Sequence, residues 1–226
     1  MKTNKFALII INLLFITTIF SQTSGLEVIK SSVNEMHSVK EYPEGFYYSY
    51  EDFINKNVRP PLDIERRSLY RNRTINNDSI VNQLFFFSMT DTTKVTEVFA
   101  ISHKGNLYIQ QQYISKYAKK GNRNEAGENP NCYHRVIKDG KYFYLEGAFG
   151  NVWAKGVTGG LVGGALASTI NNLKGVVFEF NTKKFDFIKN CKDFKLFLTE
   201  HNSDEQIDCE KYNLLTVREI IDKLIK

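Results

Sequence analysis

The sequence lacks the short motifs that accompany common catalytic and nucleotide-binding sites. It contains no Gly-x-Ser-x-Gly elbow and no His-Glu-x-x-His pair, which argues against the hydrolases and zinc proteases that use them. Its glycine-rich stretch lacks both the Gly-Lys-Ser/Thr ending of a phosphate loop and the Gly-x-Gly-x-x-Gly register of a dinucleotide site. We therefore predict no catalytic residue and no cofactor.

The sequence also has little net charge. The formal charge is +5 over 226 residues, and it falls to +3 if Lys2 and Lys5 are removed with an N-terminal signal. This excess is too small for a nucleic-acid reader, which typically carries a strongly basic stripe. The basic residues cluster only in polar, Asn-rich stretches that are typical of solvated loops. We expect no nucleic-acid partner.

Cysteine is scarce, with only Cys132, Cys191 and Cys209. Cys191 and Cys209 flank a predicted helix and the loop after it, so they can form a disulfide if that loop folds back. The alternative is that each is simply a small buried apolar residue. No cysteine lies near the end of the N-terminal apolar run, so the chain lacks the pattern of a lipid-anchored bacterial lipoprotein.

The N-terminal segment has the pattern of a secretory signal peptide. Lys2 and Lys5 precede a 15-residue apolar run at 6–20, and small polar residues follow it. A membrane-spanning helix needs roughly 20 apolar residues, so an uncleaved anchor is the weaker alternative. We expect residues 1–21 to be removed and the protein to be exported to the periplasm, the cell envelope or the extracellular space.

The rest of the chain predicts one α+β domain. Residues 22–41 are polar and weakly patterned, which indicates a flexible lead-in, whereas 42–226 is long enough to bury a sizeable core. Alternating apolar residues predict an antiparallel sheet of about six or seven strands in hairpins. The expected strands are 84–89, 95–102, 107–114, 133–137, 141–146, 175–180 and 185–189.

Capping residues predict one helix before the sheet and two helices that close the C-terminus. The three helix starts are marked by Ser49 with Asp52, Asn190 with Asp193, and Thr216 with Glu219. The last helix has the clearest apolar stripe, so it should pack on the sheet rather than stand alone.

An uncharged glycine-rich segment at 156–173 is inserted between two of the hairpins. Small residues repeat there every four positions, at Gly156, Gly160, Gly164 and Ser168. On a helix they would form a smooth face that another backbone can approach, as between membrane helices. So many glycines make a helix unstable alone in water. A buried helix or loop of a soluble fold, membrane insertion and self-association therefore all stay open.

Cys132 and His134 are weak candidates for metal binding. They are two residues apart, so on a strand they share one face and could supply two ligands to zinc or copper. A metal site needs three or four ligands, and no motif supplies the others, so we predict no metal site. A hydrolase would likewise need Cys132, His134 and acidic residues to converge in one pocket of the folded chain.

Several structural motifs carry a family resemblance. They are Tyr42-Pro43-Glu44-Gly45-Phe46-Tyr47 with Glu51-Asp52-Phe53, Ser102-His103-Lys104-Gly105-Asn106-Leu107-Tyr108, the glycine-rich segment, Gly175-Val176-Val177-Phe178 and Lys192-Asp193-Phe194. Together they resemble a family of uncharacterised secreted proteins from Bacteroidota-type bacteria, a domain of unknown function. The resemblance implies a bacterial, extracytoplasmic setting, and it assigns no catalytic residue.

These observations favour an exported, non-enzymatic envelope or periplasmic domain that binds a protein or a small-molecule ligand. One alternative is a module that associates with the membrane or with itself through 156–173. Another alternative is a hydrolase without a recognisable motif. The three hypotheses differ in what they require of the glycine-rich segment and of the surroundings of Cys132 and His134.

Overall fold

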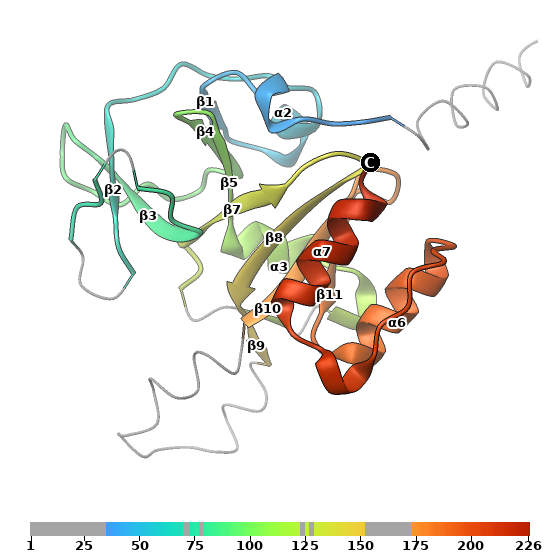
Figure 1. Ribbon diagram of the computed structural model, residues 1–226. Coiled ribbons are helices and arrows are strands. Elements are labelled where there is room, and N and C mark those ends of the chain that lie inside the picture. The colour runs from blue at the N-terminus through green and yellow to red at the C-terminus, as the bar shows by residue number, and fades with distance from the viewer. Residues whose placement is uncertain (1–34, 70–72, 77–78, 123–124, 127–128, 152–172) are drawn as a thin grey trace, which may run out of the picture. The chain divides into compact units, whose positions relative to one another are not determined.

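The fold is built on a mostly antiparallel sheet of nine strands, accompanied by four α-helices. The computed structural model describes residues 35–69, 73–76, 79–122, 125–126, 129–151 and 173–226, and all structural statements below refer to these residues. The architecture therefore belongs to the α+β class that the hairpin pattern predicted, with more strands than expected (Figure 1).

Seven strands follow one another across the sheet, and two more form a side branch. The seven are, in spatial order, β1 (Gly45–Tyr47), β4 (Ala100–His103), β5 (Asn106–Gln110), β7 (Tyr133–Lys138), β8 (Tyr142–Ala148), β10 (Leu173–Glu179) and β11 (Lys184–Ile188). The branch consists of β2 (Ile64–Arg67) and β3 (Gln83–Ser88). A separate two-stranded sheet pairs β6 (Glu125–Ala126) with β9 (Gly150–Asn151).

The sheet divides at β7. One edge of β7 pairs with β5, while Tyr133 and His134 on the same strand also pair with β3. From Val136 onward β7 pairs with β8 instead, across a register shift between Val136 and Lys138. We call β2 and β3 the β2–β3 branch, and we call β8, β10 and β11 with their covering helices the helix-covered branch.

The helix-covered branch is buried on both faces. Helices α6 (Cys191–Glu200) and α7 (Leu214–Leu224) pack on the face that carries Tyr142, Tyr144 and Val177 (Figure 1). The opposite face packs against α2 (Tyr50–Ile54) and α3 (Gln111–Lys116) in an aromatic-rich core. Successive residues of β8 thus enter different cores, as side chains on a strand alternate between its two faces.

The β2–β3 branch folds over the other end of the sheet and encloses a smaller core. Ile64 on β2 and Phe86 on β3 pack there against residues of β1, β4, β5 and β7. Phe86 contacts Tyr108 and Tyr133 edge-on, with ring centroids 5.3 Å apart in both pairs. Such edge-to-face pairs add stability beyond the burial of their area.

Two predicted strands have wrong bounds. The strand expected at 95–102 begins only at Ala100. The Val95 N–H still bonds to the Phe86 carbonyl on β3, and the chain then moves away from β3 before it enters the sheet as β4. The strand expected at 107–114 ends at Gln110, because its partner β7 begins at Tyr133, opposite Gln110. With no further ladder available, the chain continues as α3.

The sequence patterns also missed β1 and β2. Arg66 and Arg67 made this part of the chain look like an exposed connection, yet Arg66 is 4% exposed. Its guanidinium donates hydrogen bonds to the carbonyl oxygens of Asn76 (2.7 Å) and Ser79 (3.0 Å). A buried charged group needs such partners, and here they come from chain that follows β2.

The helix starts agree with two of the three capping predictions. Ser49 and Asp52 form a capping box at α2, and Asn190 caps α6. At α7 the prediction of Thr216 as the cap is wrong. Asn213 is the N-cap, because its side-chain oxygen accepts hydrogen bonds from the Leu215 and Thr216 N–H groups. An Asn side chain at this position satisfies the otherwise unpaired donors of the first turn.

Two predicted segments lie outside the described residues. The signal segment at 1–21 is one, together with most of the lead-in. The other is the glycine-rich segment with its proposed association face, Gly156, Gly160, Gly164 and Ser168, of which only the last residue, Leu173, is described, at the start of β10. Among the helices of the described residues, none combines the length and the apolar character needed to cross a bilayer.

Candidate functional site

The two residues considered for metal binding lie in different surroundings. Cys132 is fully buried beside Phe85 and Phe87, and burial raises the pKa of its thiol to about 12, so it stays protonated and unreactive. His134 is enclosed elsewhere, in contact with Phe149. Within the described ranges, no three His, Cys, Asp or Glu side chains come close enough together to hold a metal ion.

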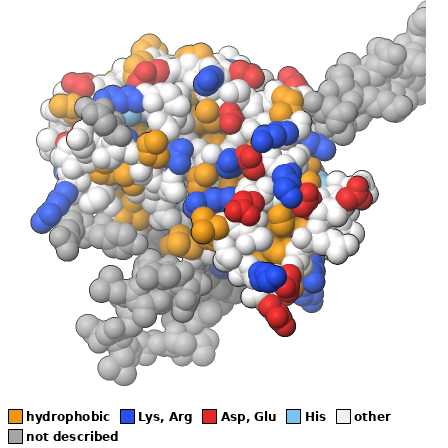
Figure 2. All heavy atoms as spheres, in the orientation of Figure 1, with side chains coloured by type: hydrophobic (Ala, Val, Ile, Leu, Met, Phe, Trp, Pro, Cys, Tyr) orange, Lys and Arg blue, Asp and Glu red, His pale blue; other side chains and the backbone are white. Residues whose placement is uncertain are grey.

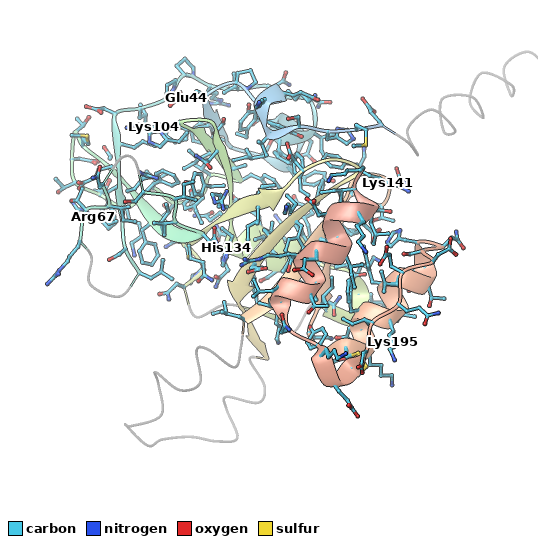
Figure 3. All side chains as sticks on the ribbon, viewed as in Figure 1. Glu44, Arg67, Lys104, His134, Lys141 and Lys195 are labelled. Carbon is cyan, nitrogen blue, oxygen red and sulfur yellow. A yellow bond between two sulfur atoms is a disulfide. The ribbon has the colours of Figure 1, made fainter. Side chains whose placement is uncertain are left out.

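His134 joins three elements at the centre of the sheet (Figure 3). Its Nδ1 lies 3.0 Å from the Glu146 carbonyl oxygen on β8, and its Nε2 lies 2.6 Å from the side-chain amide of Gln111 on α3. Complete burial lowers the pKa of His134 to about 4, so the ring is neutral at neutral pH. The Gln111 atom nearest Nε2 is the side-chain oxygen, so both ring nitrogens face an oxygen, and a neutral ring with a single N–H donates to only one of them.

A second buried contact fixes α7 to β8. The Arg218 guanidinium donates to both carboxylate oxygens of Glu146, at 2.6 Å each, and the Tyr144 hydroxyl donates to the same carboxylate at 2.9 Å. Glu146 is 4% exposed, so this two-pronged pair is largely shielded from water. All of these groups satisfy one another, which indicates an anchor rather than a binding site.

A third buried network anchors the end of α6. Burial alone would raise the pKa of Glu179, but hydrogen bonds from His201 and Lys119 outweigh it and lower this pKa to about 2. His201 also contacts the Tyr142 hydroxyl through Nδ1 at 2.8 Å, and the Lys119 ammonium reaches Asp186 at 2.7 Å. The carboxylates around Lys119 are therefore neutralised by neighbouring protein groups.

A disulfide closes the segment after α6. The structure joins Cys191 at the start of α6 to Cys209, with their Cα atoms 5.4 Å apart. The loop between them thus folds back on the helix, the arrangement that the cysteine spacing allowed. Acidic and basic side chains are interspersed over α6 and α7 (Figure 2).

A cavity lies between the β2–β3 branch and the β4–β5 turn, and we call it the mouth pocket. Its volume is about 710 Å³, against about 460 and 390 Å³ for two others. Five segments line it: Glu44 before β1, residues 61–66 at and before β2, residues 74–76, Met89 after β3, and His103 with Lys104.

The β4–β5 turn positions the charged wall of the mouth pocket. Lys104 and Gly105 both have positive φ, 50° and 71°, as the tight turn of a hairpin requires. The turn places His103 Nδ1 3.3 Å from Glu44 Oε1, and the same oxygen accepts a 3.3 Å hydrogen bond from the Lys104 N–H (Figure 3). Burial lowers the pKa of His103, and the nearby Glu44 carboxylate only partly opposes this.

The opposite wall of the mouth pocket combines apolar side chains with a strand edge. Leu62 and Met89, which both line the cavity, are 57% and 54% exposed. Ile64 itself is buried, but its backbone lies along the pocket. Eight of the thirteen lining residues are polar or charged, so this cavity is more polar than a typical small-molecule site.

The chemistry available in the mouth pocket follows from its ionisable and hydroxyl groups. His103 and Glu44 could transfer a proton, but the lining has a single hydroxyl group, on Thr74, and this hydroxyl donates to Glu65 at 3.0 Å. No lining group is thus placed as a nucleophile for His103. Cys132 and His134 do not line this pocket, so the convergence required of a hydrolase site is not found there.

Sequence reasoning identified only part of this site. The Ser102-His103-Lys104-Gly105-Asn106 turn and Glu44 were singled out as structural motifs, whereas Leu62, Ile64 and Met89 were not noticed. The alternation of Leu62, Asp63, Ile64 and Glu65 is a strand signal that could have revealed the second wall. Pro60 and Pro61 concealed it, because they suggested only the end of a helix.

Comparison with known proteins identifies a family whose function is unknown. No curated protein and no solved structure was found that matches the chain. A family model, described as a family of unknown function (DUF6563), matches residues 45–204. This range runs from β1 through α6, so it includes most of the helix-covered branch and every lining residue of the mouth pocket except Glu44. Because the match covers more than half of its length, the chain belongs to this family of unknown function.

Proposed function

We propose that the protein is an exported, non-enzymatic domain that binds its ligand in the mouth pocket. Export is supported by the charged and apolar pattern of residues 1–21. The Cys191–Cys209 disulfide also supports it, because disulfides persist mainly in oxidising compartments outside the cytosol. The proposed setting is the periplasm, the cell envelope or the extracellular space.

One observation carries the binding proposal. The mouth pocket is a cavity of about 710 Å³ whose lining includes the exposed side chains of Leu62 and Met89, the Glu44 carboxylate and the buried His103 ring. Elsewhere the buried charges, such as Glu146 and Glu179, are fully engaged by protein partners. Exposed apolar side chains beside charged groups in one cavity support the binding proposal.

A fragment screen followed by nuclear magnetic resonance would test the binding proposal. We expect fragments to shift the backbone amide signals of Glu44, Asp63 and Lys104, and we expect Leu62→Asp to weaken their binding at least tenfold. Leu196→Asp is the matched control, because Leu196 on α6 is 58% exposed. Fragments that bind elsewhere, or bind Leu62→Asp unchanged, would contradict the proposal.

Export is tested separately from binding. Mass spectrometry of the protein recovered from bacterial expression should show the loss of about the first 21 residues and a linked Cys191–Cys209 peptide. A Phe6→Asp and Leu13→Asp double change should keep the chain in the cytosol with its full N-terminus. Retention of residues 1–21 in the unchanged, soluble protein would contradict export.

A further inference from the structure

We infer that a second cleft, at the junction of the two branches, binds a small molecule that carries an apolar group and one carboxylate, with Arg135 as the cation that pairs with the carboxylate. This inference goes beyond the proposed function, because it concerns a different site from the mouth pocket. It follows from the residues that line the cleft, from the positive charge beside it, and from its apolar side chains.

The second cleft lies where the β2–β3 branch meets the helix-covered branch, and we call it the junction cleft. Its volume is about 390 Å³, which is within the range of small-molecule sites. It is lined by residues of β3, β8, β10 and α7 and by chain next to β2 and β3, namely Ser68, Leu69, Val81, Asn82, Gln83, Glu146, Leu173 and Arg218. None of these residues lines the mouth pocket, so the two cavities are separate sites.

One cation of the junction cleft is already neutralised. The Arg218 guanidinium donates to both oxygens of the Glu146 carboxylate, at 2.6 Å each. Glu146 is buried, and its carboxylate also accepts a hydrogen bond from the Tyr144 hydroxyl at 2.9 Å. Glu146 is the only carboxylate of the described lining, so a second cation at this cleft has no lining carboxylate left to pair with.

Arg135 on β7 is this second cation. It lies next to Asn82, whose side-chain oxygen accepts hydrogen bonds from Arg135 Nε at 3.1 Å and from Nη2 at 2.9 Å. An amide oxygen carries no net charge, and Arg135 forms no ion pair with any carboxylate of the described residues. Its Nη1 group likewise has no acceptor there, so one donor of the guanidinium stays available to a ligand beside Asn82.

The surroundings of Arg135 favour an anion. Burial lowers the pKa of its guanidinium, Tyr108 partly opposes this effect, and the positive charge of Arg218 lowers the pKa further. The neighbouring pair of Lys138 and Asp222 is neutral by itself, so it does not supply the missing negative charge. A ligand carboxylate would supply it, and a charged carboxylate is a stronger partner for a planar guanidinium than an amide oxygen is.

The rest of the lining indicates an apolar group on the same ligand. Leu69, Val81 and Leu173 contribute apolar side chains from three separate segments, and Leu173 is 40% exposed. Covering apolar surface that is in contact with water is favourable. Inorganic phosphate could pair with Arg135 but would leave this surface uncovered, so the lining favours a carboxylate with an apolar group.

Calorimetric titration of the disulfide-bonded protein with acetate, butyrate and phenylbutyrate tests the inference. We expect the affinity to rise along this series, because the larger members cover more of the apolar lining. The neutral amide of phenylbutyrate should bind at least tenfold more weakly, because it cannot neutralise Arg135. In nuclear magnetic resonance spectra, phenylbutyrate should shift the backbone amide signals of Asn82 and Leu173 and leave those of Glu44 and Lys104 in the mouth pocket unchanged.

Two variants locate the carboxylate and the apolar group. Arg135→Gln should weaken phenylbutyrate binding at least tenfold, whereas Arg59→Gln should not, because Arg59 is exposed and lines neither cavity. Leu173→Glu leaves the hydrogen bonds of Arg135 in place and adds a like charge to the lining, so it should also weaken phenylbutyrate binding at least fivefold. Leu196→Glu is its control, because Leu196 is 58% exposed on α6.

The outcomes separate this inference from the proposed function. Equal affinity for phenylbutyrate and its amide would overturn the role of Arg135, and equal affinity for acetate and phenylbutyrate would overturn the apolar group. Tighter binding of inorganic phosphate, or no binding at the junction cleft, would overturn the carboxylate ligand. Each of these results would leave the mouth pocket proposal standing, whereas fragments that miss the mouth pocket would contradict that proposal alone.

Discussion

The two branches of the sheet treat their polar groups differently. In the helix-covered branch, Glu146 and Glu179 are almost fully buried, and each carboxylate is held by cationic and hydroxyl partners. In the β2–β3 branch, Asp63 is exposed, and Leu62 and Met89 are more than half exposed. The buried carboxylates of one branch are paired within the protein, whereas the residues next to β2 present a carboxylate and apolar side chains to solvent.

This difference separates stability from recognition within one sheet. A buried carboxylate that loses its partner is costly, so the helix-covered branch should tolerate few substitutions. Exposed side chains contribute little to folding free energy, so their arrangement around a cavity needs another explanation. The β2–β3 branch therefore carries the proposed binding site, and the helix-covered branch holds the sheet that supports it.

The largest effect on stability is expected from acid, through protonation of His134 on β7, the strand at which the two branches meet. In the folded protein the pKa of His134 is about 4, against about 6.5 for an unfolded histidine, so the unfolded chain binds a proton first as the pH falls. Stability should be complete above about pH 6.5 and should decrease by about 3 kcal/mol on acidification to about pH 4. Urea unfolding followed by circular dichroism at several pH values measures this loss.

His134→Gln is the matching variant for the acid experiment. It should be less stable at pH 7, because it loses the fitted contacts of the ring with Phe149 and Glu146. Its stability should change much less between pH 6.5 and 4, since the titrating group is gone. An equally steep decrease in the variant would show that another group controls the acid response.

Removal of the disulfide should weaken the helix-covered branch by a similar amount. The Cys191–Cys209 bond joins residues 18 positions apart. A disulfide that closes a loop of this length restricts the unfolded chain and thereby stabilises the folded protein by about 3 kcal/mol. Cys191→Ser with Cys209→Ser should lower the urea midpoint accordingly. Alkylation without reductant is the control and should change nothing, because the remaining thiol, on Cys132, is buried and protonated. An unchanged urea midpoint in the double variant would contradict a stabilising role of the disulfide.

Loss of the Arg218 anchor should have a somewhat smaller effect. Arg218→Ala leaves the Glu146 carboxylate with the Tyr144 hydroxyl but no cation, which should cost about 2 kcal/mol because Arg218 is 32% exposed and partly screened. Lys223→Ala on the same helix removes the more exposed pair with Glu205 and should cost less than about 1 kcal/mol. Equal midpoints for the two variants would contradict the distinction between buried and exposed pairs.

Local chemistry explains which parts of the fold were predictable. The strands predicted on either side of Gly105 and Gly140 do pair, β4 with β5 and β7 with β8. Both glycines have positive φ, so the turn between the strands depends on a residue that the local sequence shows. The caps at Ser49 and Asn190 also act within three residues. In each case the partner atoms lie on the next few residues, where sequence patterns are informative.

The missed elements depend on distant chain. Burial of Arg66 requires the carbonyl oxygens of Asn76 and Ser79, which no local pattern around β2 indicates. The end of β5 at Gln110 is decided by where β7 begins, more than 20 residues later. The mouth pocket is lined both by a turn set by local residues and by β2, whose burial depends on distant chain. Only the turn could therefore be singled out from the sequence.

The smallest effect on stability is expected at the mouth pocket itself. Met89 is 54% exposed, so Met89→Gln should change the free energy of unfolding by less than about 0.5 kcal/mol. Met36→Gln is the matched control, because Met36 is 50% exposed and does not line the pocket. Urea unfolding should not distinguish the two variants. Fragments found for the pocket should bind Met89→Gln more weakly than the unchanged protein, and they should bind Met36→Gln as well as the unchanged protein. If Met89→Gln instead lowers stability by 2 kcal/mol or more, as estimated for loss of the Arg218 anchor, then Met89 belongs to the core of the β2–β3 branch, and the contrast between the two branches does not hold.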